Sequence, residues 1–368
     1  MTPIGLYVHV PFCVSKCAYC DFYSFSASPE RMDAYTDRLC ADLRRAAQQL
    51  RCPADTLYLG GGTPSLLGGK RLARIVETAR AHFGLENTEI TLEANPADDL
   101  AQTLSLGAKA GINRLSLGVQ SGIADELRAL GRRHTFADVE RTVADARNAG
   151  IENISLDLML GIPQQTAESL SRSIELLTAL DCAHISAYLL KIEPNTPFGR
   201  SRPAQLPDEE ESSALYLQTV AELAARGYAQ YEISNFARDG KISRHNTKYW
   251  TGAPYLGLGP AAHSMLNGQR FYFPADLQRY LRGEAPIADG AGGGQEEYIL
   301  LRLRLRAGID LAEYERRYGA LPERAIERMR MYVRAGYAEL DDTHFALTPQ
   351  GFLLSNTLIV DLLDRLSV

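Results

Sequence analysis

The sequence lacks any apolar run near the ~18 residues that a membrane-spanning helix needs. Residues 1–4 show neither the basic region nor the apolar region with which a signal peptide opens. The 368 residues include only six cysteines, too few for a disulfide framework in a chain of this length. No G-x-G-x-x-G or G-x-x-x-x-G-K-S/T motif follows a predicted strand, so dinucleotide and P-loop sites lack support. Together these absences predict a cytoplasmic protein.

Net positive charge is also missing. Asp and Glu number 45 against 39 Lys and Arg, giving a formal charge of −6, which argues against binding nucleic acid through overall charge. Arginines do gather between residues 302 and 330, but glutamates are interleaved with them, a pattern typical of a solvated, ion-paired helix face. We therefore expect no nucleic-acid partner.

Short apolar strands alternate with amphipathic helices through the first two thirds of the chain. Strands are predicted at residues 6–10, 56–59, 89–93, 114–119, 153–159 and 184–190. Six βα units imply parallel pairing, so the fold class is α/β, either a partial six-stranded (β/α) barrel or an open doubly wound sheet. The expected divisions are the barrel at 1–235, a connecting segment with an aromatic and histidine motif at 236–294, and a small, mainly helical domain at 295–368. That last part has a predicted hairpin at 337–340 and 344–347, which suggests a winged-helix-like form.

Three cysteines lie within eight residues, in the loop after the first predicted strand: Cys13, Cys17 and Cys20. Spacers this short let one loop fold three thiolates around a common centre. Soft thiolates suit zinc or an iron–sulfur cluster. Structural zinc normally takes four protein ligands, whereas three cysteines on a cubane cluster leave one iron open. On spacing alone both readings stand.

Two further features point to the same end of the predicted sheet. Gly60, Gly61 and Gly62 follow the second strand and are succeeded by Thr63, a turn that lets backbone approach a ligand closely, or simply a tight turn. Polar side chains also sit in or just after apolar strands: Glu93, Gln120 and Asp157. An interior carboxylate is costly unless it is paired, for instance with a barrel arginine such as Arg114, or serves a ligand. In β/α barrels the carboxyl ends of the strands line the active site.

The cysteine motif, with Tyr19 before its third cysteine, resembles the signature of the radical S-adenosylmethionine (SAM) superfamily. The resemblance implies a radical SAM barrel and a 4Fe-4S cluster on the three cysteines, whose open iron chelates S-adenosylmethionine. It also implies the residues that contact S-adenosylmethionine, which are Tyr7, Gly61, Gly62, Thr63, Glu93, Gln120, Arg132 and Asp157. Arg133 is an adjacent competitor for the role of Arg132.

Five motifs are spread along the chain, at residues 7–13, 60–65, 117–121, 157–163 and 192–196. They resemble those of the oxygen-independent coproporphyrinogen III oxidase family, and the resemblance, which covers nearly the whole chain, is strongest to its HemW-type heme chaperone branch. The implied function is to bind heme and transfer it to apo-hemoproteins; the C-terminal domain would be HemN-like. The alternative is coproporphyrinogen III oxidase. Phe22 argues against it, because the oxidase pattern has a cysteine there, and so does the short stretch before the first strand, where the oxidases carry an extension. A zinc-stabilised binding module is a third class.

The segment from His245 to Trp250 favours the chaperone branch, because it resembles the H-N-x-x-Y-W motif of that branch. Imidazole can ligate heme iron, and aromatic rings can stack on a porphyrin. His245, Tyr249 and Trp250 are therefore candidate heme contacts, with His263 a second histidine candidate; the alternative is a core histidine within an aromatic cluster. The expected partners are heme as cargo and apo-hemoproteins, membrane-anchored ones included, and a homodimer is left open.

Overall fold

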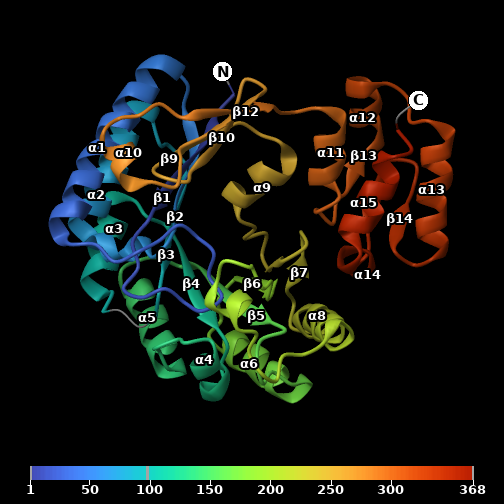
Figure 1. Cartoon of the computed structure of the whole chain (residues 1–368), viewed down its shortest axis with the longest axis horizontal. Helices are drawn as coiled ribbons and strands as arrows, with labels where there is room; N and C mark the ends of the chain where they lie inside the picture. The colour runs from blue at the N-terminus through green and yellow to red at the C-terminus, as the bar shows by residue number, and fades with distance from the viewer. Residues whose placement is uncertain (1, 97–98, 367–368) are drawn as a thin grey trace.

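A computed structural model describes residues 2–96 and 99–366 (Figure 1). Six parallel strands form its centre, as the sequence predicts, with neighbours in chain order. They are β1 (Ile4–Val10), β2 (Ala54–Gly61), β3 (Glu89–Ala94), β4 (Arg114–Gln120), β5 (Asn153–Leu160) and β6 (His184–Leu189). β1 and β6 do not pair with each other, so the six strands make a partial barrel.

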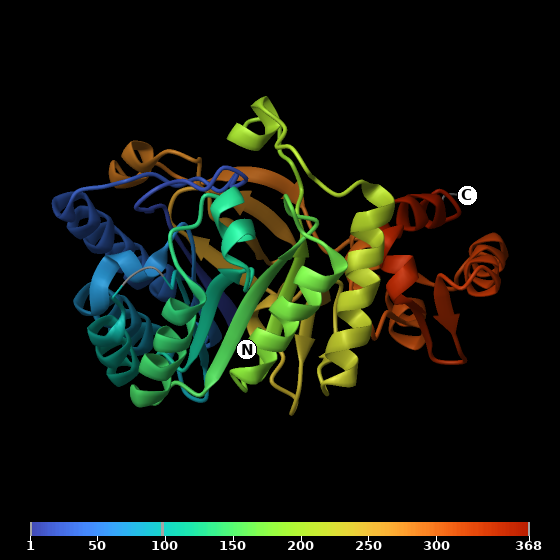
Figure 2. The ribbon, with the colours of Figure 1, turned by 90° about the horizontal axis from the view of Figure 1, so that it is seen from below.

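Helices cover the outer face of these strands (Figures 1 and 2). They are α1 (Pro29–Leu50), α2 (Gly68–Phe83), α3 (Ala101–Ala110), α4 (Ala124–Ala129), α5 (Phe136–Asn148), α6 (Ala167–Ala179) and α8 (Glu209–Ala225), with short turns η1 (Pro64–Leu67) and α7 (Pro197–Arg200) between them. Thr135, Thr166 and Asp208 begin α5, α6 and α8 with reciprocal capping boxes, which satisfy backbone N–H groups that a helix start leaves unpaired.

The sheet continues past the six predicted strands on both sides, to twelve strands in all within the described residues. The additions are β7 (Ala229–Gln230), β8 (Asn235–Ala237), β9 (Tyr255–Leu258), β10 (His263–Leu266), β11 (Gln269–Tyr272) and β12 (Ile287–Ala291). β8 pairs antiparallel with β6, and β9 pairs parallel with β1. The segment at 236–294 thus supplies most of these strands, together with α9 (Arg244–Thr251) and α10 (Leu277–Leu281).

The C-terminal part is a layer of helices with a three-stranded sheet (Figure 1). Its elements are α11 (Gln295–Arg302), β13 (Ile309–Asp310), α12 (Leu311–Tyr318), α13 (Glu323–Arg334), β14 (Ala338–Leu340), β15 (His344–Leu347), α14 (Pro349–Leu353) and α15 (Ser355–Leu363). β14 and β15 form the predicted hairpin. Backbone hydrogen bonds join this part to the barrel, from Ile233 N to Arg304 O and from Arg306 N to Tyr231 O.

No helix among residues 2–96 and 99–366 has the length and apolar character to cross a bilayer.

A substitution at Leu115 tests the packing of the central strands. Leu115 is fully buried in β4, where its neighbours on the adjacent strands are Leu92 and Ile154. We expect Leu115→Ala to lower the free energy of unfolding by about 2–5 kcal/mol through lost burial and a residual cavity. Leu354→Ala, at a side chain that is 42% exposed, should change it by less than about 0.5 kcal/mol. Urea denaturation measures both, and equal losses would contradict the assignment of β4 to the core.

Candidate functional site: a cysteine-lined cavity at the barrel mouth

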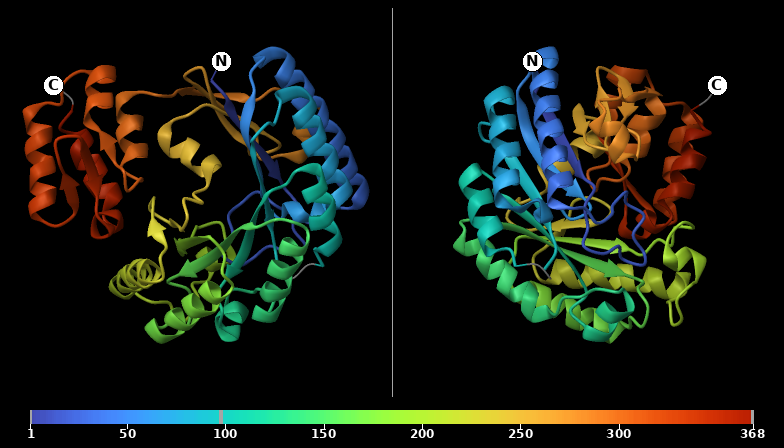
Figure 3. Two further views of the ribbon diagram at one scale, coloured as in Figure 1. Left: turned by 180° about the vertical axis from the view of Figure 1, so that it is seen from behind. Right: turned by 60° about the vertical axis from the view of Figure 1, so that its left-hand side comes forward.

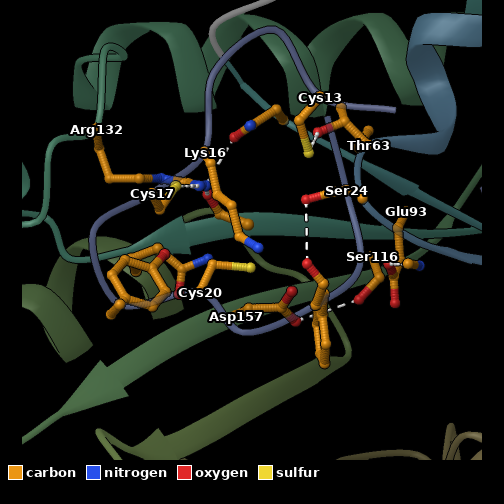
Figure 4. Close-up of a pocket in the computed structure, with 18 of the residues that line it drawn as sticks. Cys13, Lys16, Cys17, Cys20, Ser24, Thr63, Glu93, Ser116, Arg132 and Asp157 are labelled. Atoms are coloured by element: carbon orange, nitrogen blue, oxygen red, sulfur yellow. Dashed lines mark hydrogen bonds between the residues drawn. The ribbon is translucent and has the colours of Figure 1, made fainter. Parts of the chain in front are cut away.

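One cavity of about 390 Å³ opens at the carboxyl ends of the parallel strands (Figure 4). Nearly all residues that the sequence proposes for the cofactors line it: Cys13, Cys17, Cys20, Gly61, Gly62, Thr63, Glu93, Gln120, Arg132 and Asp157. Parallel pairing explains the convergence, because it brings the same end of each strand to one rim. The volume lies in the range usual for sites of small ligands.

The three cysteines sit in a loop that follows β1 and folds over the mouth (Figure 4). A backbone bond from Cys20 N to Cys17 O closes its second half. All three cysteines line the cavity, and they are half-buried with free thiols. Among the described residues, no three His, Cys, Asp or Glu side chains converge on a position for a single metal ion. A spread of sulfurs around a shared space suits a cluster, in which each cysteine binds a different iron, better than one zinc ion.

The glycine turn is bonded to the residues just before this loop. Gly62 N donates to Val10 O at 2.8 Å and Thr63 N to Phe12 O at 2.7 Å. Gly61 has a φ of +111°, and a Cβ on Gly62 would lie 2.6 Å from Phe12 O, so neither position accepts a side chain without a shift. Thr63 Oγ1 lies 3.4 Å from the Cys13 sulfur. The turn therefore fixes the start of the cysteine loop.

Glu93 and Asp157 face the cavity from β3 and β5. Removal from water raises the pKa of Glu93 to about 7, with the negative charge of Asp157 adding to the rise, and raises the pKa of Asp157 to about 6. Hydrogen bonds oppose both shifts: Tyr58 Oη and Gly61 N donate to Glu93 at 2.7 and 3.1 Å, and Ser116 Oγ donates to Asp157 at 3.2 Å.

Arg114 does not neutralise these carboxylates directly. It is fully buried in β4, and its charge lowers the pKa of both acids, yet neither forms an ion pair with it in the part of the chain that the structure describes. Two carboxylates that share an enclosed wall favour a ligand that carries positive charge there.

Arg132 supplies the positive group of the opposite wall. Its guanidinium donates to Asn95 Oδ1 at 2.7 Å, Gly118 O at 2.5 Å and the Cys17 sulfur at 3.4 Å. Arg133, the neighbouring competitor, is exposed and does not line this cavity. A fixed cation beside the cysteines suits thiolates and a ligand carboxylate. The cavity thus offers acidic groups on one side and a cation on the other, which fits a bound amino acid moiety.

Gln120 holds an unusual backbone conformation at the rim. Its φ is +70°, and the register of β4 against β5 shifts between Leu117 and Gln120. Side chains other than glycine rarely adopt this region, and such outliers concentrate where a structure serves a ligand. The shift turns β4 just where it meets the cavity.

Several proposed residues lie outside the cavity lining. Tyr7 lies in β1, with its hydroxyl 3.0 Å from His9 Nδ1 and its ring 6.3 Å from that of Tyr58. His245 is buried in α9, and its two ring nitrogens lie 2.8 Å from Thr56 Oγ1 and 2.8 Å from Tyr249 Oη. Heme ligation by His245 stays a prediction. In the structure, each of its two ring nitrogens lies within hydrogen-bond distance of a protein hydroxyl.

The other two heme candidates lie further away. Trp250 is half-buried, bonded to Glu232 and next to residues of the C-terminal part. His263 is exposed and stacks on Tyr272 with ring centroids 5.1 Å apart. The structure therefore does not bring the aromatic segment and the cysteine loop into one pocket.

Some cavity residues were not singled out from the sequence, among them Tyr58, Asn95 and Tyr188. Asn95 stands two residues after Glu93, and its strand-end position is the signal that could have identified it. Tyr58 carries a polar hydroxyl within an apolar strand. Glu93 and Asp157 were identified as polar side chains in apolar strands, and the same criterion would have found Tyr58.

Family models and known proteins match this chain along most of its length. The model described as the radical SAM superfamily matches residues 7–177, and that of the HemN C-terminal domain matches residues 295–354. A protein of Mycobacterium tuberculosis (strain CDC 1551 / Oshkosh) named heme chaperone HemW is 36% identical over 380 residues, covering 98% of this chain and 95% of the relative.

Proteins of the same name agree closely in length with this chain. The one from Bacillus subtilis (strain 168) is 35% identical and covers 95% of this chain and 96% of its own; the one from Escherichia coli (strain K12) is 33% identical and covers 98% of both. Among solved structures, the coproporphyrinogen III oxidase HemN from Escherichia coli, described as a radical SAM enzyme, superposes with a TM-score of 0.84 at 23% identity, over 98% of this chain and 90% of that one. That likeness shows the fold.

We expect Glu93→Gln to remove one pH dependence from the folding of the cofactor-free protein. Glu93 has a pKa of about 7 when folded against 4.5 ordinarily, so between these values the unfolded chain binds fewer protons than the folded one. The free energy of unfolding of the wild type should therefore fall as pH rises through this window, by up to about 3 kcal/mol. Urea denaturation from pH 4.5 to 7 should give a flatter profile for Glu93→Gln.

Glu152→Gln is the control for that profile, because Glu152 is exposed beside the start of β5. It should retain the wild-type slope. The same slope in Glu93→Gln would contradict the raised pKa.

Proposed function

Because the chain belongs to the HemW family within the radical SAM superfamily, we propose that it is a heme chaperone, which binds heme and transfers it to apo-hemoproteins. The observation that carries the proposal is the agreement with relatives of that name over nearly the full length of both chains. The cavity supports it, since the groups expected of such a protein line one space.

The residues present fit a 4Fe-4S cluster together with S-adenosylmethionine. Cys13, Cys17 and Cys20 would hold the cluster, leaving one iron for the second cofactor. Glu93 and Asp157 would face the positive charges of S-adenosylmethionine, and Arg132 its carboxylate. When bound, this pair of cofactors supplies one-electron chemistry, which the chain orients and shields from water.

Phe22 supports the chaperone over the oxidase. It lines the cavity and is 63% exposed, at the place where the oxidase pattern has a cysteine. Phenylalanine can neither bind iron nor transfer a proton, but it adds apolar area at the mouth. Tyr188 lines the cavity as well, and its side chain is 41% exposed. Such a rim suits contact with an apolar ring system more than decarboxylation of a bound porphyrinogen.

The proposal extends to partners and location. Heme is the cargo, apo-hemoproteins are the recipients, membrane-anchored ones among them, and the working site is the cytoplasm. A homodimer stays a prediction.

The cluster assignment is tested by anaerobic reconstitution followed by iron and sulfide analysis. Wild-type protein should hold about four irons per chain, and the triple variant Cys13→Ala, Cys17→Ala, Cys20→Ala close to none. The matched control replaces the remaining three cysteines, Cys40, Cys52 and Cys182, by alanine. Those thiols lie away from the cavity, so the control should retain full iron. Four irons per chain in the Cys13, Cys17 and Cys20 variant would contradict the assignment of the cluster to these cysteines.

The chaperone assignment is tested by titrating reconstituted protein with heme and following the Soret band. We expect saturation at one heme per chain, and then transfer to an apo-hemoprotein, followed by the recovery of its activity. The same preparation should leave coproporphyrinogen III unchanged. Stoichiometric conversion to protoporphyrinogen IX would establish the oxidase instead, because a carrier needs no decarboxylation.

A further inference from the structure

Helix α9, which carries His245, Tyr249 and Trp250, lies against the inner face of the barrel (Figure 3). Glu89 of β3 accepts the backbone N–H groups of Arg244 and His245, and so caps the start of the helix. Lys248 pairs with Asp55 of β2 at 2.8 Å. The helix also lies close to β1: a Cβ added to Gly5 would be only 2.9 Å from Lys248 Cδ. The helix is thus fixed to three strands near the end opposite the cavity mouth.

The imidazole of His245 packs on a tyrosine of the cavity wall. Its ring stacks on that of Tyr58, with centroids 5.1 Å apart and an interplanar angle of 27°. Thr56 and Tyr249 hold the ring by their hydroxyls at its two nitrogens. Burial lowers the pKa of His245 to about 3, so the ring is neutral at physiological pH and can stack without carrying charge into the barrel.

Tyr58 in turn orients Glu93. Its hydroxyl donates to one carboxylate oxygen at 2.7 Å, while Gly61 N occupies the other at 3.1 Å. No other hydrogen bond to the Glu93 side chain is found among the described residues. His245 is therefore separated from the cavity by one side chain, and that side chain fixes the carboxylate.

We propose that His245 is a positioning residue of the S-adenosylmethionine site, which holds the ring of Tyr58 so that its hydroxyl orients Glu93 toward the bound cofactor. This inference rests on the proposed function, which supplies the cofactor. It gives the aromatic segment a role in the cofactor wall in place of axial ligation of heme. With Thr56 and Tyr249 on its two nitrogens, His245 has no lone pair left for iron unless the helix leaves the barrel.

The test measures the affinity of reconstituted protein for S-adenosylmethionine by equilibrium dialysis, and the change that the cofactor causes in the electron paramagnetic resonance spectrum of the reduced cluster. Tyr58→Phe keeps the ring but removes the hydroxyl, and should weaken binding about tenfold, the effect of one lost hydrogen bond to a charged group. His245→Ala should weaken it about three- to tenfold. Tyr58→Phe with His245→Ala should bind no more weakly than the weaker single variant, because both act through one hydroxyl.

Tyr228→Phe is the matched control. Tyr228 is buried in the segment between α8 and β7, and its hydroxyl donates to Cys182 O, away from the cavity. It should lower the melting temperature but leave affinity and spectrum at wild-type values. If His245→Ala does not fold, Tyr249→Phe, which removes only the hydroxyl at the imidazole, carries the same test together with Tyr58→Phe.

The outcomes separate the inference from its premise. Wild-type protein that binds no S-adenosylmethionine would overturn the proposed cofactor and the positioning role together. Wild-type binding that His245→Ala leaves unchanged, or losses that add in the double variant, would overturn the positioning role alone. So would the disappearance of the heme Soret band in His245→Ala with cofactor affinity intact, since that is the behaviour of an axial ligand.

Discussion

Because β1 to β6 pair in parallel, their six carboxyl ends lie at one rim of the barrel. The residues that line the cavity lie in these strand ends or in the segments that follow them. The division of labour follows the stiffness of the parts. Strands hold the acids Glu93 and Asp157, whose position must be fixed because an enclosed carboxylate is costly when misplaced. The loop between β1 and α1 holds the cysteines, which must wrap around a bulky inorganic group. The glycine turn after β2 bonds the two together.

Inside the part of the barrel that the structure describes, the negative charges of Glu93 and Asp157 are not paired directly with a positive side chain. Arg114 lowers the pKa of both acids from within the sheet but does not pair with either, and Arg132 is directed to Asn95, Gly118 and Cys17. Removal from water raises the pKa of both acids, and the nearby arginines offset that rise only in part. A ligand with separated positive and negative groups offsets the remainder, so the cavity selects its ligand by charge as well as shape.

The central strands and the cysteine loop could be predicted because their signals are local: runs of apolar residues of strand length, and three thiols within eight positions. The strands after residue 235 could not. β9 and β10 are four residues long, and the glycines around residue 257 resemble a loop. They are strands because β9 pairs with β1, and because β10 pairs with β9 and β11. For the same reason the motif around His245 was interpretable as a ligand site or a core cluster, since its meaning depends on Tyr58, almost 190 residues earlier. Tyr7 stays a predicted cofactor contact; its ring lies 6.3 Å from that of Tyr58, which lines the cavity.

The pairing of β1 with β9 has a consequence for how the chain is made. β1 leaves the ribosome before the other described strands, and its partner on one side follows about 250 residues later. Until then one edge of β1 offers unpaired backbone groups, the template on which chains aggregate. Contacts this distant in sequence also form slowly. The barrel therefore stays incomplete at this edge of β1 until β9, which follows all six central strands in the sequence, has been synthesised. Translation that stops before β9 should leave a product that associates more readily than it folds.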